Sequence, residues 1–326
     1  MATVITGGAG FVGINIASAL LARGEIVVVF DRSLVPAVAQ RHLESLPGKL
    51  ISVIGDITNR DQLMRAITDH GVSKMVHGAA ITAGLAREAR EPALIVTVNT
   101  IGTIEALEAA LACNLSRVVQ LGTGSVYGRS PPRKSVIDED DAPHPESLYG
   151  ISKYAAESIA RRYRTTRGLD IAVGRLGVVF GRWEYDTGMR DTLSMPLQLM
   201  KAAVAGESVR LPAALPDDWV YATDIASAVV GMLDATCLDQ EIYQLATGHR
   251  WSVAGWCDRL KTAYPDFQYE LVDDITRATL GSASPAPRAP FSVARLKAAT
   301  GFTARYDEAT AFDDYLAWHR ELATDT

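Results

Sequence analysis

The glycines near the start of the chain constrain its fold most. Gly8-Ala9-Gly10-Phe11-Val12-Gly13 fits the pattern G-x-G-x-x-G, follows the apolar run Ala2–Ile5 and opens the apolar stretch Val12–Arg23. A strand, a tight glycine turn and a helix in this order let the backbone approach a pyrophosphate at the positive end of the helix. The pattern predicts a dinucleotide site whose loop contacts are Gly7, Gly10, Phe11, Val12 and Gly13.

Short β-branched runs alternate with amphipathic stretches through the first 175 residues. The expected strands are Ala2–Ile5, Ile26–Phe30, Leu50–Ile54, Lys74–His77, Arg117–Leu121 and Asp170–Arg175. The expected helices are Val12–Arg23, Arg60–His70, Pro92–Ala112 and Tyr149–Thr166. This alternation predicts an α/β fold, a Rossmann-like doubly wound parallel sheet covered on both faces and joined by right-handed crossovers.

The alternation weakens beyond Arg175. Segments 181–218 and 263–291 are irregular and rich in Gly, Pro, Trp or Arg, whereas Trp219–Leu233 returns to a strand followed by a helix. We therefore expect a nucleotide-binding domain at 1–175 plus about 219–248, and a smaller C-terminal α/β substrate-binding portion at about 176–218 plus 249–326.

Composition narrows the class of partner and the compartment. The net charge of −6 argues against nucleic acid and against anionic membranes. No stretch approaches about 20 unbroken apolar residues, so we expect no membrane span, and the apolar N-terminus lacks the basic region of a signal peptide. Three scattered cysteines without a C-x-x-C pair fit a reducing compartment, so a cytoplasmic protein without a metal site is expected.

Residues after the second, third and fourth strands suggest how a dinucleotide is held. Asp31 lies 18 residues past Gly13, where a carboxylate accepts hydrogen bonds from the adenosine ribose and repels a 2′-phosphate. This favours NAD over NADP, although the adjacent Arg32 is a residue that accommodates a 2′-phosphate in other proteins. Asp56 is a candidate for the adenine amino group or for a helix cap. Gly78-Ala79-Ala80 lies at the end of a parallel strand, where ligands bind.

Two short patterns, LGTGSVYG at 121–128 and YGISK at 149–153, predict the reacting groups. Tyr149 and Lys153 are four residues apart and share one face of a helix. A tyrosine hydroxyl has an ordinary pKa of about 10, and a neighbouring ammonium lowers it toward the range of a useful base. Thr123 follows a strand that ends on the same sheet edge as the glycine loop, so its hydroxyl is expected beside that of Tyr149.

The whole set of motifs resembles the extended short-chain dehydrogenase/reductase family, also called the NAD-dependent epimerase/dehydratase family. The similarity covers nearly the whole chain and rests on TGGAGFVG (6–13), Asp31, GDI (55–57), HGAA (77–80), VNTIGT (98–103), LGTGSVYG, YGISK, RLGVVFG (175–181) and DDWVYATDIA (217–226). The resemblance implies Tyr149 as the acid/base, Lys153 as its partner and ribose ligand, and Thr123 as the catalytic hydroxyl. The further cofactor contacts it implies are Asp31, Arg32, Asp56, Ile57, Gly78, Ala79, Ala80, Asn99 and Leu176.

Departures from the family pattern bear on the reaction and substrate. Dehydratases of the family carry an Asp-Glu pair after the catalytic Thr, and this chain has Gly124-Ser125 there. Nucleotide-sugar epimerases usually carry Asn where this chain has Gly177, and Arg before the Asp-aromatic pair. We therefore expect a small sugar, sugar acid or related polyhydroxy compound. The expected substrate contacts are Thr82, Thr123, Ser125, Tyr149, Gly177, Arg182, Trp183 and Arg190, with Arg190 as a carboxylate ligand.

The sequence leaves three hypotheses for function. The first is an NAD-dependent dehydrogenase in which Tyr149 removes the proton of a secondary hydroxyl. The second is an NAD-dependent sugar or nucleotide-sugar epimerase, in which the cofactor stays bound and the hydride returns to the substrate. The third is a dinucleotide sensor without catalytic activity. The resemblance also implies a homodimer, formed through the two helices at about 94–112 and 149–166.

Overall fold

A computed structural model describes residues 1–128, 135–185, 190–212, 216–280 and 289–324. Parts of the two irregular segments, 181–218 and 263–291, therefore lie outside the described residues.

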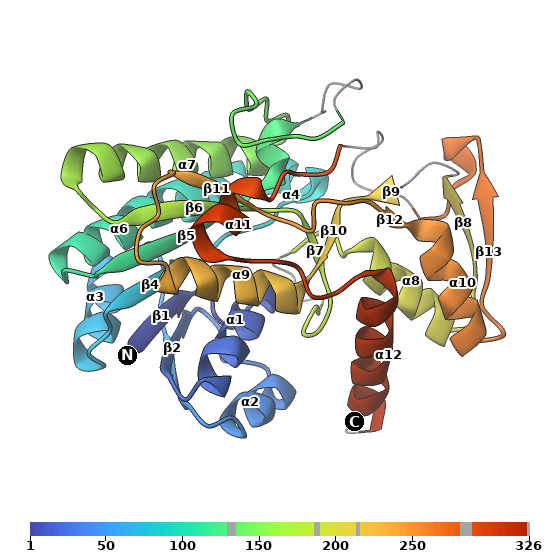
Figure 1. Cartoon of the computed structure of the whole chain (residues 1–326), viewed down its shortest axis with the longest axis horizontal. Helices are drawn as coiled ribbons and strands as arrows, with labels where there is room; N and C mark the ends of the chain where they lie inside the picture. The colour runs from blue at the N-terminus through green and yellow to red at the C-terminus, as the bar shows by residue number, and fades with distance from the viewer. Residues whose placement is uncertain (129–134, 186–189, 213–215, 281–288, 325–326) are drawn as a thin grey trace.

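Seven parallel strands form the central sheet in the order β11-β6-β5-β4-β1-β2-β3 (Figure 1). They are β1 (Ala2–Thr6), β2 (Ile26–Asp31), β3 (Lys49–Ile54), β4 (Lys74–His77), β5 (Arg117–Thr123), β6 (Ile171–Leu176) and β11 (Ile242–Leu245). Every residue of β1 and β5 is buried, as a parallel sheet covered on both faces requires. The predicted fold class is confirmed, and each predicted strand lies within two residues of its observed bounds.

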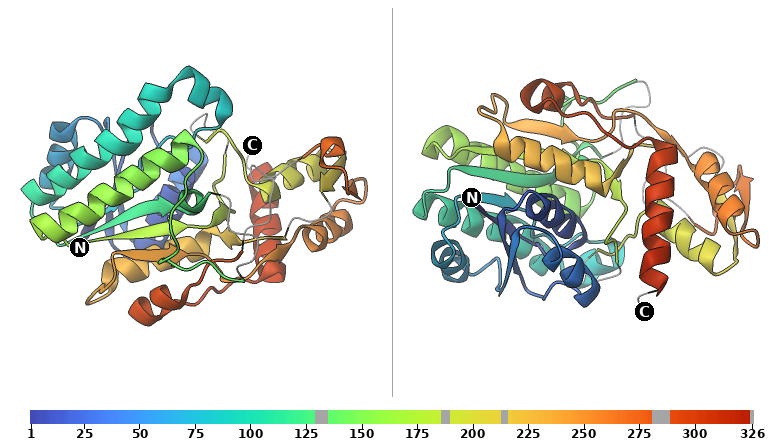
Figure 2. Two further views of the ribbon diagram at one scale, coloured as in Figure 1. Left: turned by 90° about the horizontal axis from the view of Figure 1, so that it is seen from above. Right: turned by 60° about the horizontal axis from the view of Figure 1, so that its bottom comes forward.

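Helices cover both faces of the sheet, as the two views of Figure 2 show. One face carries α3 (Arg60–Asp69), α5 (Pro92–Val96), α6 (Gly102–Ala112) and α7 (Leu148–Arg167). The other carries α1 (Phe11–Ala22), α9 (Ala222–Asp234) and α11 (Ala294–Thr300), with α2 (Ala37–Glu44) beside α1. Two apolar clusters, one on each side of the sheet, make up most of the buried core.

The predicted helix at Pro92–Ala112 is interrupted by a π-helical turn, η1 (Thr97–Ile101), between α5 and α6. By length and composition alone this run could cross a membrane, but it packs against α3 and α7 as a helix of the core does. Leu94, Ile101 and Ile151 leave apolar side chains exposed on this helical layer. The homodimer through these helices stays a prediction.

A smaller α/β portion lies beyond the carboxyl ends of the strands, at the right of Figure 1. It contains α8 (Met195–Val204), β8 (Ser208–Pro212), α10 (Val253–Ala263), β13 (Gln268–Val272), η3 (Ile275–Arg277) and α12 (Glu308–Thr324). Two short pairs, β7 (Val178–Phe180) with β10 (Trp219–Tyr221) and β9 (Pro216–Asp217) with β12 (Trp251–Ser252), connect it to the sheet. Its core is an aromatic cluster around Phe180, which contacts Trp219, Trp251, Trp256 and Tyr315.

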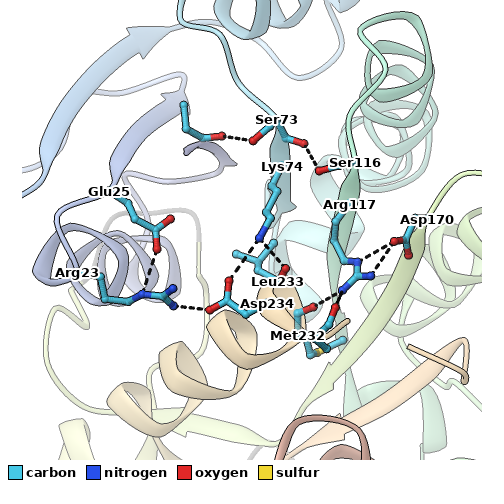
Figure 3. Close-up of polar contacts among 12 residues, drawn as sticks. Arg23, Glu25, Ser73, Lys74, Ser116, Arg117, Asp170, Met232, Leu233 and Asp234 are labelled. Atoms are coloured by element: carbon cyan, nitrogen blue, oxygen red, sulfur yellow. Dashed lines mark hydrogen bonds and ion pairs between the residues drawn. The ribbon is translucent and has the colours of Figure 1, made fainter. Parts of the chain in front are cut away.

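Polar side chains hold the C-terminal end of α9 to the amino ends of the strands (Figure 3). Lys74 Nζ donates to the carbonyl of Leu233 at 2.8 Å, and Arg117 donates to the carbonyl of Met232 at 3.0 Å and to Asp170. Cations at this position satisfy the last helix carbonyls and oppose the negative end of the helix dipole. These contacts at the amino ends of the strands therefore stabilise the fold. The carboxyl ends of the strands, on the opposite side of the sheet, remain available for a site.

Candidate functional site

The glycine loop connects β1 to α1 and leaves the N-terminus of that helix open. Gly7 has a φ of +70°, and a Cβ on it would lie 2.8 Å from the Ala79 backbone. A Cβ on Gly13 would lie 2.5 Å from the Gly7 carbonyl oxygen. No side chain caps the helix at Gly10, so the first-turn N–H groups remain available to an anion, as in other helix-terminal phosphate sites.

Asp31 ends β2 directly beside this loop. Its Oδ2 accepts a hydrogen bond from the Ala9 N–H at 3.1 Å, and its Oδ1 accepts one from Ser33 at 3.2 Å. Burial raises the pKa of this carboxyl, and the backbone donors oppose that shift. Arg32, whose side chain is 57% exposed, lies 4.0 Å from Asp56. Asp31 is thus fixed at the loop, whereas Arg32 is drawn toward a carboxylate on the next strand's loop.

A cavity of about 1090 Å³ extends from the glycine loop across the carboxyl ends of the strands. Most of the predicted site residues line it. They are Gly7, Gly10, Phe11, Val12, Gly13, Asp31, Arg32, Ile57, Gly78, Ala79, Ala80, Thr82, Thr123, Ser125, Tyr149, Leu176, Gly177 and Arg190. Residues separated by more than 180 positions in the sequence therefore share one wall.

Tyr149 lies in the first turn of α7, and it lines the cavity together with Thr123 and Thr82. Interactions with Thr123 and Thr82 lower the pKa of Tyr149, as does the charge of Arg190, but burial raises this pKa by more. Thr123 Oγ1 also accepts the Ser125 N–H at 3.1 Å, because the chain turns there into the 3₁₀ helix η2 (Gly124–Tyr127). The arrangement brings an ionisable hydroxyl and a hydrogen-bonding hydroxyl to the same part of the cavity.

Lys153 lies one turn further along α7 and is 3% exposed. Its Nζ donates to the carbonyl of Leu121 on β5 at 2.8 Å. Burial lowers the pKa of this lysine to about 8, against the opposing charge of Glu157. Because its ammonium is directed to the β5 backbone in the described structure, the expected effect of Lys153 on Tyr149 stays a prediction.

Two further predicted cofactor residues, Asn99 and Asp56, are not among the described residues that line the cavity. Asn99 is buried and exchanges hydrogen bonds with Ile81, at 2.8 and 3.1 Å, so it fixes the loop after β4. Asp56 accepts hydrogen bonds from the Thr58 N–H and hydroxyl, which form a local turn, and the N-cap of α3 is Asn59. Both remain predicted cofactor contacts, and their observed partners are structural.

Arg182 and Trp183 are placed away from the substrate end of the cavity. Both guanidinium contacts of Arg182 go to Asp314 on α12, at 2.9 and 2.5 Å. Trp183 is 5% exposed and packs between His42 and Trp318. We therefore withdraw both as substrate ligands, because their polar and apolar surfaces are already used to hold α12 and α2 against this loop.

Arg190 does reach the cavity. Its Nη1 donates to Glu184 Oε1 at 2.8 Å and its Nη2 to the Val179 carbonyl at 3.3 Å. The guanidinium also lies 5.5 Å from the centre of the Phe11 ring in the glycine loop. Arg190 and Tyr149 therefore line the same cavity. The role of Arg190 as a ligand for a carboxylate of the substrate stays a prediction.

A family model described as the NAD dependent epimerase/dehydratase family matches residues 3–246. The chain belongs to that family. The predicted family resemblance is confirmed, together with the Rossmann-like sheet.

Several of the proteins to which this chain is similar are nucleotide-sugar epimerases by name. The UDP-glucose 4-epimerase of Mycolicibacterium smegmatis is 29% identical over 71% of this chain and 72% of its own length. The UDP-glucuronate 4-epimerase 4 of Arabidopsis thaliana is 29% identical over 71% of this chain, but only 53% of its own length is covered. The fold is similar to that of the UDP-glucose 4-epimerase of Thermotoga maritima, with a TM-score of 0.83, 22% identity and coverage of 99% and 100% of the two chains.

Several residues that line the cavity were not predicted from the sequence. The far wall is formed by Tyr185, Leu193, Ser194, Met195, Gln198 and Trp219. The Tyr185 hydroxyl is buried and has no hydrogen-bond partner among the described residues. Trp219 begins β10. The other residues come from an irregular segment and from the start of α8, where no periodicity indicates which side chains point inward.

Proposed function

We propose that this protein is an NAD-dependent epimerase that inverts a hydroxyl-bearing carbon of a nucleotide sugar. The observation that carries the proposal is the presence of Tyr149 and Thr123 on the wall of the cavity that also contains the glycine loop. Membership of the family, and similarity to UDP-glucose and UDP-glucuronate 4-epimerases, support epimerisation over the net oxidation that the sequence alone favoured.

The loop residues fit NAD. The space that a Cβ on Gly7 or Gly13 would fill is closed by backbone, so the loop keeps the tight turn that a pyrophosphate requires. The fixed carboxylate of Asp31 suits ribose hydroxyls and repels a 2′-phosphate, so we expect NAD rather than NADP. When bound, NAD accepts a hydride from a substrate carbon and can return it.

Residues of the protein itself then transfer the proton of the substrate hydroxyl. Thr123 holds the substrate oxygen, and Tyr149 takes the hydroxyl proton as that oxygen becomes a carbonyl. Tyr149 returns the proton when the hydroxyl is restored on the opposite face. Lys153, whose pKa is lowered to about 8 by burial, is largely cationic at neutral pH and favours the ionised form of Tyr149. Gly124 and Ser125 occupy η2 and carry no carboxyl group for dehydration.

A second candidate is a dehydrogenase of a small polyhydroxy compound. Gly177 favours it, because the cavity wall carries no side-chain amide at the place where nucleotide-sugar epimerases of the family usually have Asn. A Cβ there would lie 3.3 Å from the Asp218 carbonyl oxygen and 3.4 Å from the Ala246 side chain, so this part of the wall leaves little room for a larger residue. Arg182 is paired with Asp314 and does not line the cavity, so its cation is not placed to hold a sugar diphosphate there.

The deciding experiment incubates the purified protein with NAD and either UDP-glucose, UDP-glucuronic acid or a panel of free sugars and sugar acids. We expect an epimeric nucleotide sugar, identified by NMR, without net NADH absorbance. Replacing Tyr149 by Phe should lower turnover by about 10²- to 10⁴-fold, because a positioned acid/base contributes that much. Arg162→Met, an exposed change on the same helix α7, is the control and should retain full turnover.

Two results would replace the proposal. One NADH formed per product molecule would make the protein a dehydrogenase. NAD binding without conversion of any compound in the panel would favour the sensor hypothesis. Full turnover in Tyr149→Phe would remove Tyr149 from the mechanism altogether.

A further inference from the structure

The segment that carries Arg190 is anchored to the nucleotide-binding half of the molecule. Arg190 pairs with Thr82 as an isolated β-bridge, and the Asp191 N–H donates to the Thr82 carbonyl at 3.0 Å. The Asp191 carboxylate accepts the Gly84 N–H at 2.9 Å and Arg87 Nε at 3.0 Å. The backbone of Arg190 is therefore fixed against the loop that follows β4.

The side chain of Arg190 is fixed by an ion pair with Glu184. Glu184 is fully buried at its carboxylate and accepts hydrogen bonds from the Ser194 N–H at 2.7 Å and hydroxyl at 2.6 Å, besides that from Arg190. A carboxylate held in this way gives the guanidinium one preferred position. Since Arg190 is itself three-quarters buried at its side chain, its charge acts through a medium that screens it less than water does.

Thr82 links this cation to the reacting hydroxyl. Its backbone pairs with Arg190, and its side chain interacts with the Tyr149 hydroxyl. We propose that Arg190, oriented by Glu184 and by the Thr82–Asp191 contacts, is a positioning residue that keeps Tyr149 beside Thr123 and favours its ionised form. The inference rests on the proposed function, because it assigns a second cation to the same acid/base. In accord with it, the charge of Arg190 lowers the pKa of Tyr149.

Other charged groups surround Tyr149 and must be kept constant in the test. Lys153 is on the same helix, and its Nζ is engaged by the Leu121 carbonyl. Glu88 on α4 (Leu85–Arg90) accepts the Leu148 N–H at 3.0 Å, and Glu146 lines the same cavity. A carboxylate near Tyr149 opposes its ionisation and a cation favours it. Of these charged groups, Arg190 is the one whose charge lowers the pKa of Tyr149, and the effect of Lys153 stays a prediction.

The test measures the ionisation of Tyr149 directly, by NMR of the NAD-loaded protein labelled at tyrosine Cζ. The chain has 11 tyrosines, and the Tyr149 signal is identified by its loss in Tyr149→Phe. In Arg190→Met and Arg190→Gln we expect the titration midpoint to move to higher pH. Arg190→Lys, which keeps the charge, should stay near the parent midpoint, and Arg162→Met should not change it. Gln retains a donor for Glu184, so it serves if the Met variant does not fold.

Arg190→Met and Arg190→Gln should also move the rising limb of kcat against pH to higher pH. At neutral pH their kcat should be about tenfold lower than that of the parent protein. An unchanged Tyr149 midpoint in both neutral variants would overturn the inference. So would an increase in KM confined to carboxylate-bearing substrates, which would make Arg190 a substrate ligand. The NMR titration needs no turnover, so failure of the proposed epimerase activity would leave its result intact.

Discussion

His77 shows how a side chain below the cavity is shaped by burial. It is completely buried, with Nδ1 2.8 Å from the Thr6 hydroxyl and Nε2 3.0 Å from the Thr103 hydroxyl. Burial and the charge of Lys153 lower its pKa to about 3. The ring is therefore neutral at physiological pH and joins β1, β4 and α6 directly beneath the Gly78–Ala80 wall of the cavity.

A pH dependence of stability follows. The ordinary histidine pKa of 6.5 applies in the unfolded chain and about 3 in the folded one, so the unfolded state binds more protons between these values. The contribution of His77 to the free energy of unfolding should fall as the pH drops from about 6.5 toward 3. His77→Asn should be less stable by about 1–3 kcal/mol at pH 7, from lost buried hydrogen bonds, but the gap should narrow in acid. Urea unfolding at several pH values checks this, and a constant gap would contradict it.

At the scale of elements, the strand–loop–helix unit at the N-terminus was predictable because every part of it is local. The strand is β-branched, the glycines make the turn, and the helix follows without a capping side chain. In contrast, α2 and α4 were not predicted. Both are short, at eight and six residues, and short helices depend on tertiary contacts rather than on their own periodicity.

Gly13→Ala should test this unit. The new Cβ would lie 2.5 Å from the Gly7 carbonyl oxygen and 2.6 Å from Gly8 Cα, so the loop must open. We expect NAD affinity to fall at least tenfold and the melting temperature to drop. Gly24→Ala is the control: its Cβ would meet nothing within 4 Å, and its φ of +78° should cost only about 1–2 kcal/mol of strain. Calorimetric titration with NAD would contradict the prediction if both variants bound equally.

At the scale of the whole molecule, the loop after β7 joins the two portions. Asn15 on α1 donates to the Arg182 carbonyl at 2.8 Å, and the Arg182 side chain pairs with Asp314 on α12. Trp183 has a φ of +69°, a conformation that costs energy for any residue with a side chain. Its packing against His42 and Trp318 holds it there.

Breaking this connection should destabilise the protein without removing a catalytic group. Asp314→Asn leaves Arg182 without its carboxylate and should lower the free energy of unfolding by about 1–3 kcal/mol. A double-mutant cycle with Arg182→Met should give a coupling energy of about 0.5–3 kcal/mol. Asp313→Asn, at an exposed neighbour on α12, should change stability little. Additive effects of the Asp314 and Arg182 changes would show that the pair does not connect the two portions.

The sequence by itself determined the sheet and the family. It also predicted that Thr123, Tyr149 and the glycine loop belong to one site; all of them line one cavity, and their roles stay predictions. These features depend on short-range patterns: β-branched strands, glycine spacing, and two residues one helical turn apart. It also placed Arg190 at the site, though as a substrate ligand.

Only the tertiary structure decided the irregular segment. Arg182, Trp183 and Arg190 all lie in the same irregular segment of the sequence. Arg182 pairs with a carboxylate 132 residues away, Trp183 packs between two helices, and Arg190 lines the cavity. An irregular segment has no periodicity that fixes side-chain direction. Each side chain of this segment points toward the distant charge or apolar surface with which it pairs. Only the folded chain brings those partners together.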